Sequence, residues 1–220
     1  MNSTPLYQVL IVDDHPMITQ SYENAFHEVA GNHAYKFQLH IAHSFQEVQY
    51  QLEHYYTVNT LDLIIIDLKL PAYPKMGWYS GEEFATYIKK ELPDTKIIIA
   101  TMFSNHFKIQ NLFKKVNPDG FLTKSELTPE IMNACITDVI EGGPYYSKQV
   151  ISSLRKNLVN PIDLDNTDVQ LLYQLSIGTM TKDLPQKLFL SLASVERRKK
   201  RLREVFDIAT QKSDQALILK

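Results

Sequence analysis

Short apolar runs alternate with longer amphipathic segments through the first 142 residues of this 220-residue chain. The apolar runs have the length of strands that are buried on both faces of a sheet. They are Val9–Val12, Leu61–Ile66, Ile97–Ala100 and Gly120–Leu122, with a more alternating candidate at Phe37–Ala42. Apolar residues recur at helical spacing in the segments that follow them, which are Pro16–Val29, Phe45–Tyr55, Gly81–Glu91, His106–Val116 and Thr128–Glu141. Five alternations of strand and helix predict an α/β fold with a doubly wound, five-stranded parallel sheet.

Polar residues at the predicted helix starts support these boundaries. Ser44 precedes Glu47 by three residues, which is a capping-box pattern. Ser80 precedes a first turn that is rich in Glu, and Thr128 is followed by Pro129 at the first helical position. Each pattern indicates a helix that begins where the apolar periodicity begins.

The chain changes character after a Gly-Gly-Pro run at 142–144, which ends the last helix of the first part. We assign residues 1–142 to a first domain, 143–163 to a linker with one short helix near Lys148–Leu158, and 164–220 to a small all-α domain. In that domain the periodicity predicts helices at Thr167–Ser176, Thr181–Phe189, Ser191 to about Phe206, and Asp214–Leu219. A short helix, a tight turn and a basic helix form the layout of a helix-turn-helix.

Charge is divided unequally between the two parts. Residues 1–142 hold 17 Asp and Glu against 10 Lys and Arg, whereas residues 143–220 hold 8 against 13. A basic second part predicts a polyanionic partner, although two solvated surfaces of opposite sign would give the same counts. The single cysteine, Cys135, excludes a disulfide within the chain and disfavours a cysteine-based zinc site. No stretch approaches the length of a membrane span, so we expect a cytoplasmic protein without a membrane partner.

Polar residues follow four of the predicted strands at their carboxyl ends. Asp13 and Asp14 follow the first strand, Asp67 the third, Thr101 the fourth and Lys124 the fifth. In a doubly wound sheet these ends meet at one edge, where ligands bind. Three carboxylates in one pocket repel one another unless a cation joins them, and Mg²⁺ prefers oxygen ligands. A carboxylate nucleophile beside a metal, a hydroxyl and a lysine makes a phosphoryl-acceptor site.

Four segments resemble the motifs of response-regulator receiver domains, namely VLIVDDHP, LDLIIIDLKLP, IIIATMF and GFLTK. The resemblance covers residues 6–142 and implies a flavodoxin-like receiver fold. It implies that Asp67 accepts a phosphoryl group from a histidine of a sensor kinase. It also implies that Mg²⁺ is held by Asp13, Asp14, Asp67 and the backbone carbonyl of Lys69.

The same resemblance implies that Thr101 and Lys124 bind the phosphoryl group and that Phe121 is the aromatic switch residue. Taken singly, these residues have simpler explanations. Lys124 alone fits a solvated surface lysine, and Phe121 fits an ordinary core position about equally well. The agreement of five separated polar residues in type, order and strand context favours the acceptor site.

The loop after the third predicted strand departs from the family pattern. Residues 71–80 make it longer than usual and include Tyr73, Lys75, Trp78 and Tyr79. The insertion could shape the choice of kinase or contact another partner. A tolerated surface insertion is an equally good explanation.

A dense basic segment follows in the all-α domain. Within seven positions it carries Arg197, Arg198, Lys199, Lys200, Arg201 and Arg203. Apolar residues near helical spacing leave the opposite face cationic, which suits the major groove of DNA. We expect DNA contacts from Ser194, Arg197, Arg198, Lys199 and Arg201. The alternative is a solvated basic helix, or one that binds an acidic protein surface.

Residues 164–208 resemble the LuxR-type helix-turn-helix of NarL/FixJ response regulators. The matching positions are Leu164, Gly178, Leu184, Leu188, Ser191, Ser194, Val195 and Leu202. Three departures concern the basic helix. Glu196 replaces the usual Lys, Arg198 replaces the usual His, and Val205-Phe206-Asp207 replaces the usual Lys-Leu-Gly. These changes bear on base preference and on dimer contacts more than on the fold.

The leading hypothesis is a response regulator of a two-component system. A sensor histidine kinase phosphorylates Asp67 with Mg²⁺ and thereby controls binding of double-stranded DNA and transcription. We expect the active form to be a homodimer, because helix-turn-helix proteins read paired half-sites. The runner-up is a signalling adaptor whose C-terminal helices bind a protein. The pocket would catalyse only its own phosphorylation and dephosphorylation, so we expect no separate enzyme activity.

Overall fold

The structure of the protein is a computed structural model that describes residues 4–56, 61–102, 106–159 and 165–205. The chain divides into two compact units, Met1–Leu154 and Arg155–Lys220. The division lies inside the segment assigned to the linker, whereas the boundaries expected at 142 and 164 stay predictions. Within the described ranges, no helix is both long enough and apolar enough to cross a membrane.

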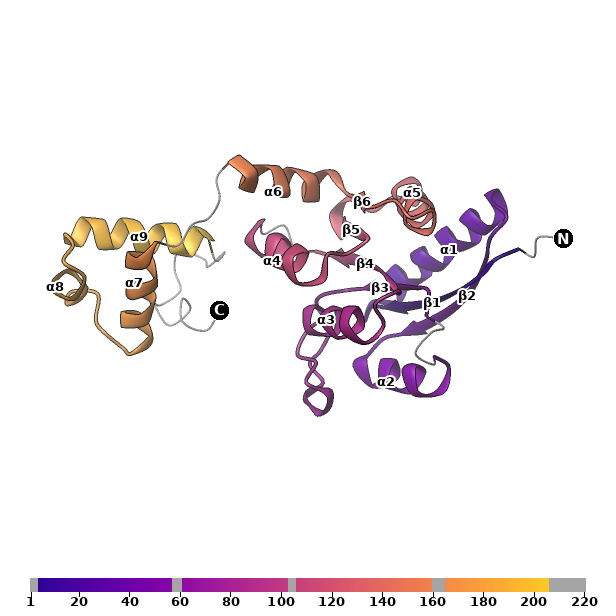
Figure 1. Cartoon of the computed structure of the whole chain (residues 1–220), viewed down its shortest axis with the longest axis horizontal. Helices are drawn as coiled ribbons and strands as arrows, with labels where there is room; N and C mark the ends of the chain where they lie inside the picture. The colour runs from indigo at the N-terminus through magenta and orange to yellow at the C-terminus, as the bar shows by residue number, and fades with distance from the viewer. Residues whose placement is uncertain (1–3, 57–60, 103–105, 160–164, 206–220) are drawn as a thin grey trace. The chain divides into compact units, whose positions relative to one another are not determined.

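Parallel strands form one sheet in the first unit, in the order β2-β1-β3-β4-β5-β6 (Figure 1). The strands are β1 (Leu6–Val12), β2 (Lys36–Ala42), β3 (Leu63–Ile66), β4 (Lys96–Thr101), β5 (Gly120–Thr123) and β6 (Tyr145–Tyr146). The doubly wound parallel sheet is confirmed, with six strands where five were predicted. Strand β6 has only two residues, which is too short to produce a periodicity, and its pairing with β5 defines it.

Helices cover both faces of this sheet (Figure 1). One face packs against α1 (Pro16–Asn32) and α5 (Pro129–Ile140). The other packs against α2 (Phe45–His54), α3 (Gly81–Glu91) and α4 (His106–Val116). Neighbouring strand residues enter opposite cores: Ile64 faces α2, α3 and α4, whereas Ile65 faces α1 and α5. Because both faces are covered, the central strand β3 is apolar along its whole length, as are the runs Val9–Val12 in β1 and Ile97–Ala100 in β4, whereas the edge strand β2 alternates apolar and polar residues.

The predicted helix starts at the sheet edge are confirmed. Ser44, Ser80 and Thr128 each accept a hydrogen bond from a backbone amide in the first turn of their helix. These side chains satisfy donors that the helix itself cannot pair. The ends of α2, α3 and α5 that approach the carboxyl edge of the sheet are therefore fixed by the local sequence.

The segment after β6 forms α6 (Lys148–Val159), one residue longer than the helix predicted there. The second unit contains α7 (Asn166–Ser176), α8 (Leu184–Leu188) and α9 (Leu192–Val205). Its core consists of Leu171, Leu175, Leu184, Leu188, Val195 and Leu202.

Helix α8 is shorter than the predicted range Thr181–Phe189. Residues 181–183 form a turn, and Pro185 lies in the first turn of α8, where its missing N–H costs nothing. Gly178 ends the preceding helix with φ of +81°, a conformation that glycine adopts without strain. The predicted helix Asp214–Leu219 lies outside the described residues.

Candidate functional site

The carboxyl ends of β1 and β3 place two aspartates side by side. The backbone N–H of Asp67 donates to the carbonyl of Val12 at 2.9 Å, and that of Asp13 donates to the carbonyl of Ala42 at 3.1 Å. The ladder of the sheet therefore continues through both residues. Their side chains are almost fully buried, with 1% of Asp13 and 3% of Asp67 exposed.

Lys124 pairs with both carboxylates. Its Nζ lies 2.7 Å from Oδ2 of Asp13 and 2.6 Å from Oδ2 of Asp67, and only 4% of its side chain is exposed. An ammonium in this position offsets part of the repulsion between the two buried carboxylates. The pairing also excludes the alternative explanation of Lys124 as a solvated surface lysine.

A wider acidic cluster surrounds this pair. Ligand atoms of Asp13, Asp14, His15 and Asp67 all lie within 4.8 Å of one another. Asp13 Oδ2 and Asp14 Oδ1 are buried without a hydrogen bond, although Lys124 and His15 lie within ion-pair distance of them. Buried oxygens that keep unused lone pairs fit the preference of a hard divalent cation. The cluster can therefore hold a divalent metal ion.

His15 also belongs to this cluster, although the sequence analysis did not single it out. Its Nδ1 lies 2.6 Å from Oδ1 of Asp14, and its backbone N–H donates to Oδ1 of Asp13 at 3.1 Å. No metal-ligand spacing marks His15 in the sequence, because it approaches the pocket only through the turn after β1. The contact orients both carboxylates toward the site.

The backbone around Asp67 is restrained by close packing. The N–H of Lys69 donates to Oδ1 of Asp67 at 3.1 Å. The expected role of the Lys69 carbonyl as a metal ligand stays a prediction. The N–H of Gly81 donates to the carbonyl of Leu68 at 3.1 Å. A Cβ on Gly81 would overlap the carbonyl oxygen of Asp67. Glycine therefore allows the first residue of α3 to pack directly against the Asp67 backbone.

Thr101 and Phe121 lie on the neighbouring strands. Thr101 is the last residue of β4, is fully buried, and stands in register with Thr123 of β5. Phe121 is also fully buried, and its ring stacks on that of Phe113 in α4 with centroids 5.6 Å apart. The expected roles of Thr101 toward a phosphoryl group and of Phe121 as a switch stay predictions.

The pocket also contains a tyrosine that the sequence analysis missed. Tyr22 of α1 is fully buried, and burial followed by the charges of Asp13 and Asp67 raises the pKa of its hydroxyl. The hydroxyl therefore stays protonated, although it makes no hydrogen bond of normal geometry in the structure. Helical periodicity predicts Tyr22 as a core residue and does not show that its polar end approaches the strand ends.

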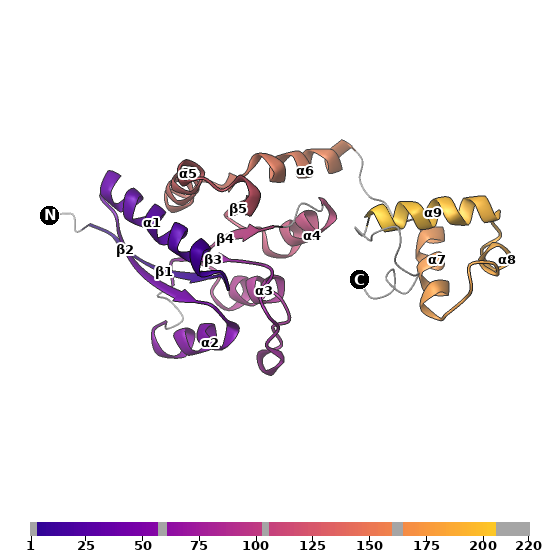
Figure 2. The ribbon, with the colours of Figure 1, turned by 180° about the vertical axis from the view of Figure 1, so that it is seen from behind.

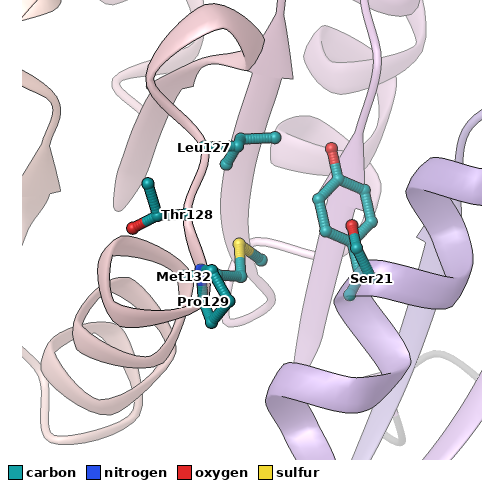
Figure 3. Close-up of a pocket in the computed structure, with 6 residues that line it drawn as sticks. Ser21, Leu127, Thr128, Pro129 and Met132 are labelled. Atoms are coloured by element: carbon teal, nitrogen blue, oxygen red, sulfur yellow. The ribbon is translucent and has the colours of Figure 1, made fainter.

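A small cavity lies beside Tyr22. It measures about 100 Å³ and lies between α1 and the start of α5. Figure 3 shows Leu127, Thr128, Pro129 and Met132 on one side and Ser21 of α1 on the other. Its lining is mostly apolar, so it differs in chemistry from the acidic cluster.

Some basic side chains of α9 form ion pairs within the second unit. Arg198 Nη1 lies 2.7 Å from Oδ2 of Asp165 and 2.7 Å from Oδ1 of Asp168. Asp168 is fully buried, and Nη1 of Arg201 lies 3.6 Å from its other oxygen. The hydrogen bond between Asp165 and Arg198 lowers the pKa of Asp165 and raises that of Arg198. Arg198 therefore fastens α9 to the start of α7.

Lys199 is also buried and hydrogen-bonded within the second unit. Only 3% of the residue is exposed, and its Nζ donates to Oγ1 of Thr181 at 2.7 Å. Of the expected DNA contacts, the structure thus places Arg198 and Lys199 on inward faces of α9. Arg197 and Arg201 are exposed, as is Lys200, and Ser194 is half-buried in the first turn. These exposed cations recur at the spacing of one helical face.

The comparisons with known proteins agree with this arrangement. The model of the response regulator receiver domain matches residues 9–136, which is more than half of the chain. The chain belongs to the response regulator receiver family. Its receiver fold is therefore shown both by the sheet topology and by this match.

Two relatives are similar in sequence to this receiver chain. The oxygen regulatory protein NreC of Staphylococcus epidermidis is 27% identical over 151 residues, which are 63% of this chain and 66% of NreC. The match thus spans slightly less than two thirds of that relative. The transcriptional regulatory protein MctR of Rhizobium johnstonii is 23% identical over 219 residues, which are 96% of this chain and 92% of MctR.

A solved structure extends the likeness to both units. RcsB of Salmonella enterica serovar Typhimurium, bound to a promoter in the presence of the phosphomimetic BeF3−, superposes with a TM-score of 0.70 at 18% identity. The superposition covers 97% of this chain and 96% of RcsB. At this identity the likeness concerns the fold alone.

The receiver of this chain carries the insertion at residues 71–80 as a short hairpin (Figure 1). Tyr73 and Trp78 pair across it, around a turn of 3₁₀ helix at Pro74–Met76. Only 3% of Trp78 is exposed, and its ring packs on Phe84 of α3 at 4.8 Å. The hairpin is therefore anchored in the receiver core. Its role in the choice of a kinase or another partner stays a prediction.

Proposed function

We propose that this chain is a response regulator whose receiver accepts a phosphoryl group on Asp67 from a sensor histidine kinase. The single observation that carries the proposal is the buried ion pair of Lys124 with Asp67, 2.6 Å long, beside the acidic cluster. A carboxylate that is paired, buried and open to a divalent cation has the features of a phosphoryl acceptor. Mg²⁺ is the proposed metal, held by Asp13, Asp14 and Asp67.

The chemistry follows from the positions of these groups. An oxygen of Asp67 forms a bond to phosphorus while the phosphorus–nitrogen bond of the phosphohistidine breaks, and the leaving imidazole keeps the electron pair. Lys124 lies where it can hold an oxygen of the transferred group, and Thr101 ends the adjacent strand with a hydroxyl donor. A bound Mg²⁺ would supply charge neutralisation for the transferred group.

We propose that the second unit binds double-stranded DNA through the exposed face of α9. Arg197, Lys200 and Arg201 are its exposed cations, and they can contact phosphates or guanine edges. NreC and MctR are named as regulatory proteins, and RcsB is bound to a promoter, which supports control of transcription by this chain. A phosphorylated homodimer acting in the cytoplasm is the proposed active form, since paired half-sites favour two copies.

Labelling with a small phosphoryl donor such as acetyl phosphate tests the acceptor. Full-length protein with Mg²⁺ should gain one phosphoryl group on Asp67, identified by mass spectrometry. The variant Asp67→Asn should gain none, whereas Asp94→Asn, which changes an exposed aspartate, should label normally. Labelling of Asp67→Asn at another residue would refute the assignment.

Selection of genomic DNA fragments at physiological salt tests the output. A shared sequence whose recovery increases with BeF3− supports phosphorylation-controlled DNA binding.

The second candidate function is a signalling adaptor. Two observations favour the adaptor. Arg198 and Lys199 are bound to Asp168 and Thr181 within the unit, and Glu196 adds an exposed negative charge to the same helix. Recovery of only salt-sensitive random DNA would support the adaptor.

A further inference from the structure

The amino end of α6 is tied to the strand that leads into the acceptor pocket. Ser147, directly before α6, donates its backbone N–H to the carbonyl of Phe121 in β5 at 3.0 Å. The hydroxyl of Ser147 lies 3.3 Å from that of Thr123 and accepts the Thr123 backbone N–H at 3.4 Å. Ser147 is buried, so these bonds are shielded from water.

Glu126 forms a second link between β5 and the amino end of α6. Its Oε2 accepts a hydrogen bond from the hydroxyl of Thr123 at 2.7 Å and another from the backbone N–H of Gln149 at 3.2 Å. Burial alone would raise the pKa of Glu126, but hydrogen bonds from Ser147, Thr123 and Gln149 lower it overall. A carboxylate near the amino end of a helix satisfies a donor there and complements the helix dipole.

Apolar contacts hold the same end of α6. Val150 is fully buried in the core that contains Phe121, and Leu154 packs against that core. The ring of Tyr146 meets that of Phe113 edge-on at 4.9 Å, and Phe113 stacks on Phe121. The two opposite views show α6 next to α4, beyond the edge of the sheet formed by β5 and β6 (Figures 1 and 2).

The pocket and this connection share one short turn. Lys124 and Glu126 are the first and last residues of a single turn of 3₁₀ helix, Lys124–Glu126. The side chain of Lys124 enters the acceptor pocket, whereas that of Glu126 holds the start of α6. Only one residue separates Lys124 from Glu126, and a backbone hydrogen bond from Leu127 to the carbonyl of Lys124 closes the turn. A change in the position of Lys124 is therefore passed to Glu126.

We propose that Glu126 is a positioning residue that couples the state of the acceptor pocket to helix α6. The coupling rests on the proposed function, because it requires that Asp67 accept a phosphoryl group. The added group places its oxygens farther from the Asp67 carboxyl carbon than the carboxylate oxygens that Lys124 contacts before transfer. Lys124 follows these oxygens, the 3₁₀ turn shifts, and Glu126 releases the N–H of Gln149. The first turn of α6 then loosens at the point where the receiver leads into the rest of the chain.

Amide hydrogen exchange of the full-length chain tests this coupling at Gln149 and Val150. In the wild type, BeF3− with Mg²⁺ should speed exchange at Gln149 about fivefold, the size of one lost helix cap. Glu126→Ala should show this faster exchange without BeF3−, and adding BeF3− should change it less than twofold. Glu126→Gln keeps an acceptor oxygen and should restore part of the response. Glu28→Gln, an exposed change on α1, should behave as the wild type.

Labelling of Asp67 in the same samples separates the coupling from the proposed function. Normal labelling in Glu126→Ala together with a lost response at Gln149 supports the coupling, because a merely structural role would not remove the response selectively. An unchanged response in Glu126→Ala would overturn the coupling, and so would a labelled wild type without any change at Gln149. A wild type that cannot be labelled on Asp67 would overturn the proposed function and the coupling together.

Discussion

The ammonium of Lys124 lies 2.6 Å from Oδ2 of Asp67, and 4% or less of either side chain is exposed. Removing one partner of a buried ion pair leaves the other charge without compensation. Lys124→Met should therefore lower the free energy of unfolding by about 3 kcal/mol, measured by urea denaturation. Mg²⁺ should restore part of the loss in this variant, because a cation can replace the missing ammonium.

The matched control is Lys90→Met, which removes a surface lysine paired with Glu91 at 2.9 Å. An exposed pair of this kind contributes about 1 kcal/mol or less. Equal destabilisation by the two substitutions would contradict the buried role of Lys124.

Gly81 permits the contact between α3 and the backbone of Asp67. In Gly81→Ala the new methyl group would overlap the Asp67 carbonyl, so either α3 or the acceptor strand must move. We expect the rate of phosphoryl labelling to fall about tenfold or more, because small displacements of a reacting group are costly. The free energy of unfolding should fall by about 1–3 kcal/mol.

Gly31 provides the contrast for this substitution. It lies in α1, and an added Cβ there would meet nothing within 4 Å. Gly31→Ala should label at the wild-type rate and gain about 0.5 kcal/mol of stability from the better helix former. A Gly81→Ala variant that labels as fast as Gly31→Ala would show that the close packing of Gly81 on the Asp67 backbone is not needed for phosphorylation of Asp67.

Arg197 and Arg198 are neighbours in sequence, but we expect the first to act in DNA binding and the second in the stability of the second unit. Arg197→Ala should weaken DNA binding and lower the slope of log affinity against log salt by about one, without a change in stability. Arg198→Ala should mainly destabilise the second unit, by about 1–3 kcal/mol, because the buried Asp168 loses its 2.7 Å partner. Salt-dependent binding and chemical denaturation of both variants test the difference. A stable Arg198→Ala variant with the larger loss of salt-dependent binding would reverse the assignment.

The bond between Asp165 and Arg198 predicts an acid-sensitive second unit. The pKa of Asp165 is lowered in the folded state, chiefly by its hydrogen bond with Arg198. The stability that this pair contributes is therefore present above the ordinary Asp pKa of about 3.9 and is lost as the pH falls below it. Acid unfolding followed through the amides of α7 and α9 should be shallower in Asp165→Asn than in the wild type. Parallel acid profiles for the two proteins would exclude the pair as a cause.

The order of the elements could be predicted from the sequence because both faces of the sheet are covered. Runs such as Ile97–Ala100 are apolar throughout, and the helices between them keep one apolar stripe and polar caps such as Ser44. The meeting of Asp13, Asp67 and Lys124 followed from the same pattern, because parallel strands end at one edge. These features depend on local periodicity and on topology, and the chain encodes both in short segments.

Contacts between distant segments could be decided only by the tertiary structure. Charge counting cannot separate Arg197 from Arg198, since the inward position of Arg198 depends on Asp168, which lies 30 residues away. The two-residue strand β6 and the hydrogen bond from Gln149 to Glu126 leave no periodic pattern. Tyr22 has the spacing of a core residue, and the position of its hydroxyl depends on where α1 packs against the sheet. Periodicity thus determines which face of an element is buried, whereas the packing of whole elements determines which polar atoms meet there.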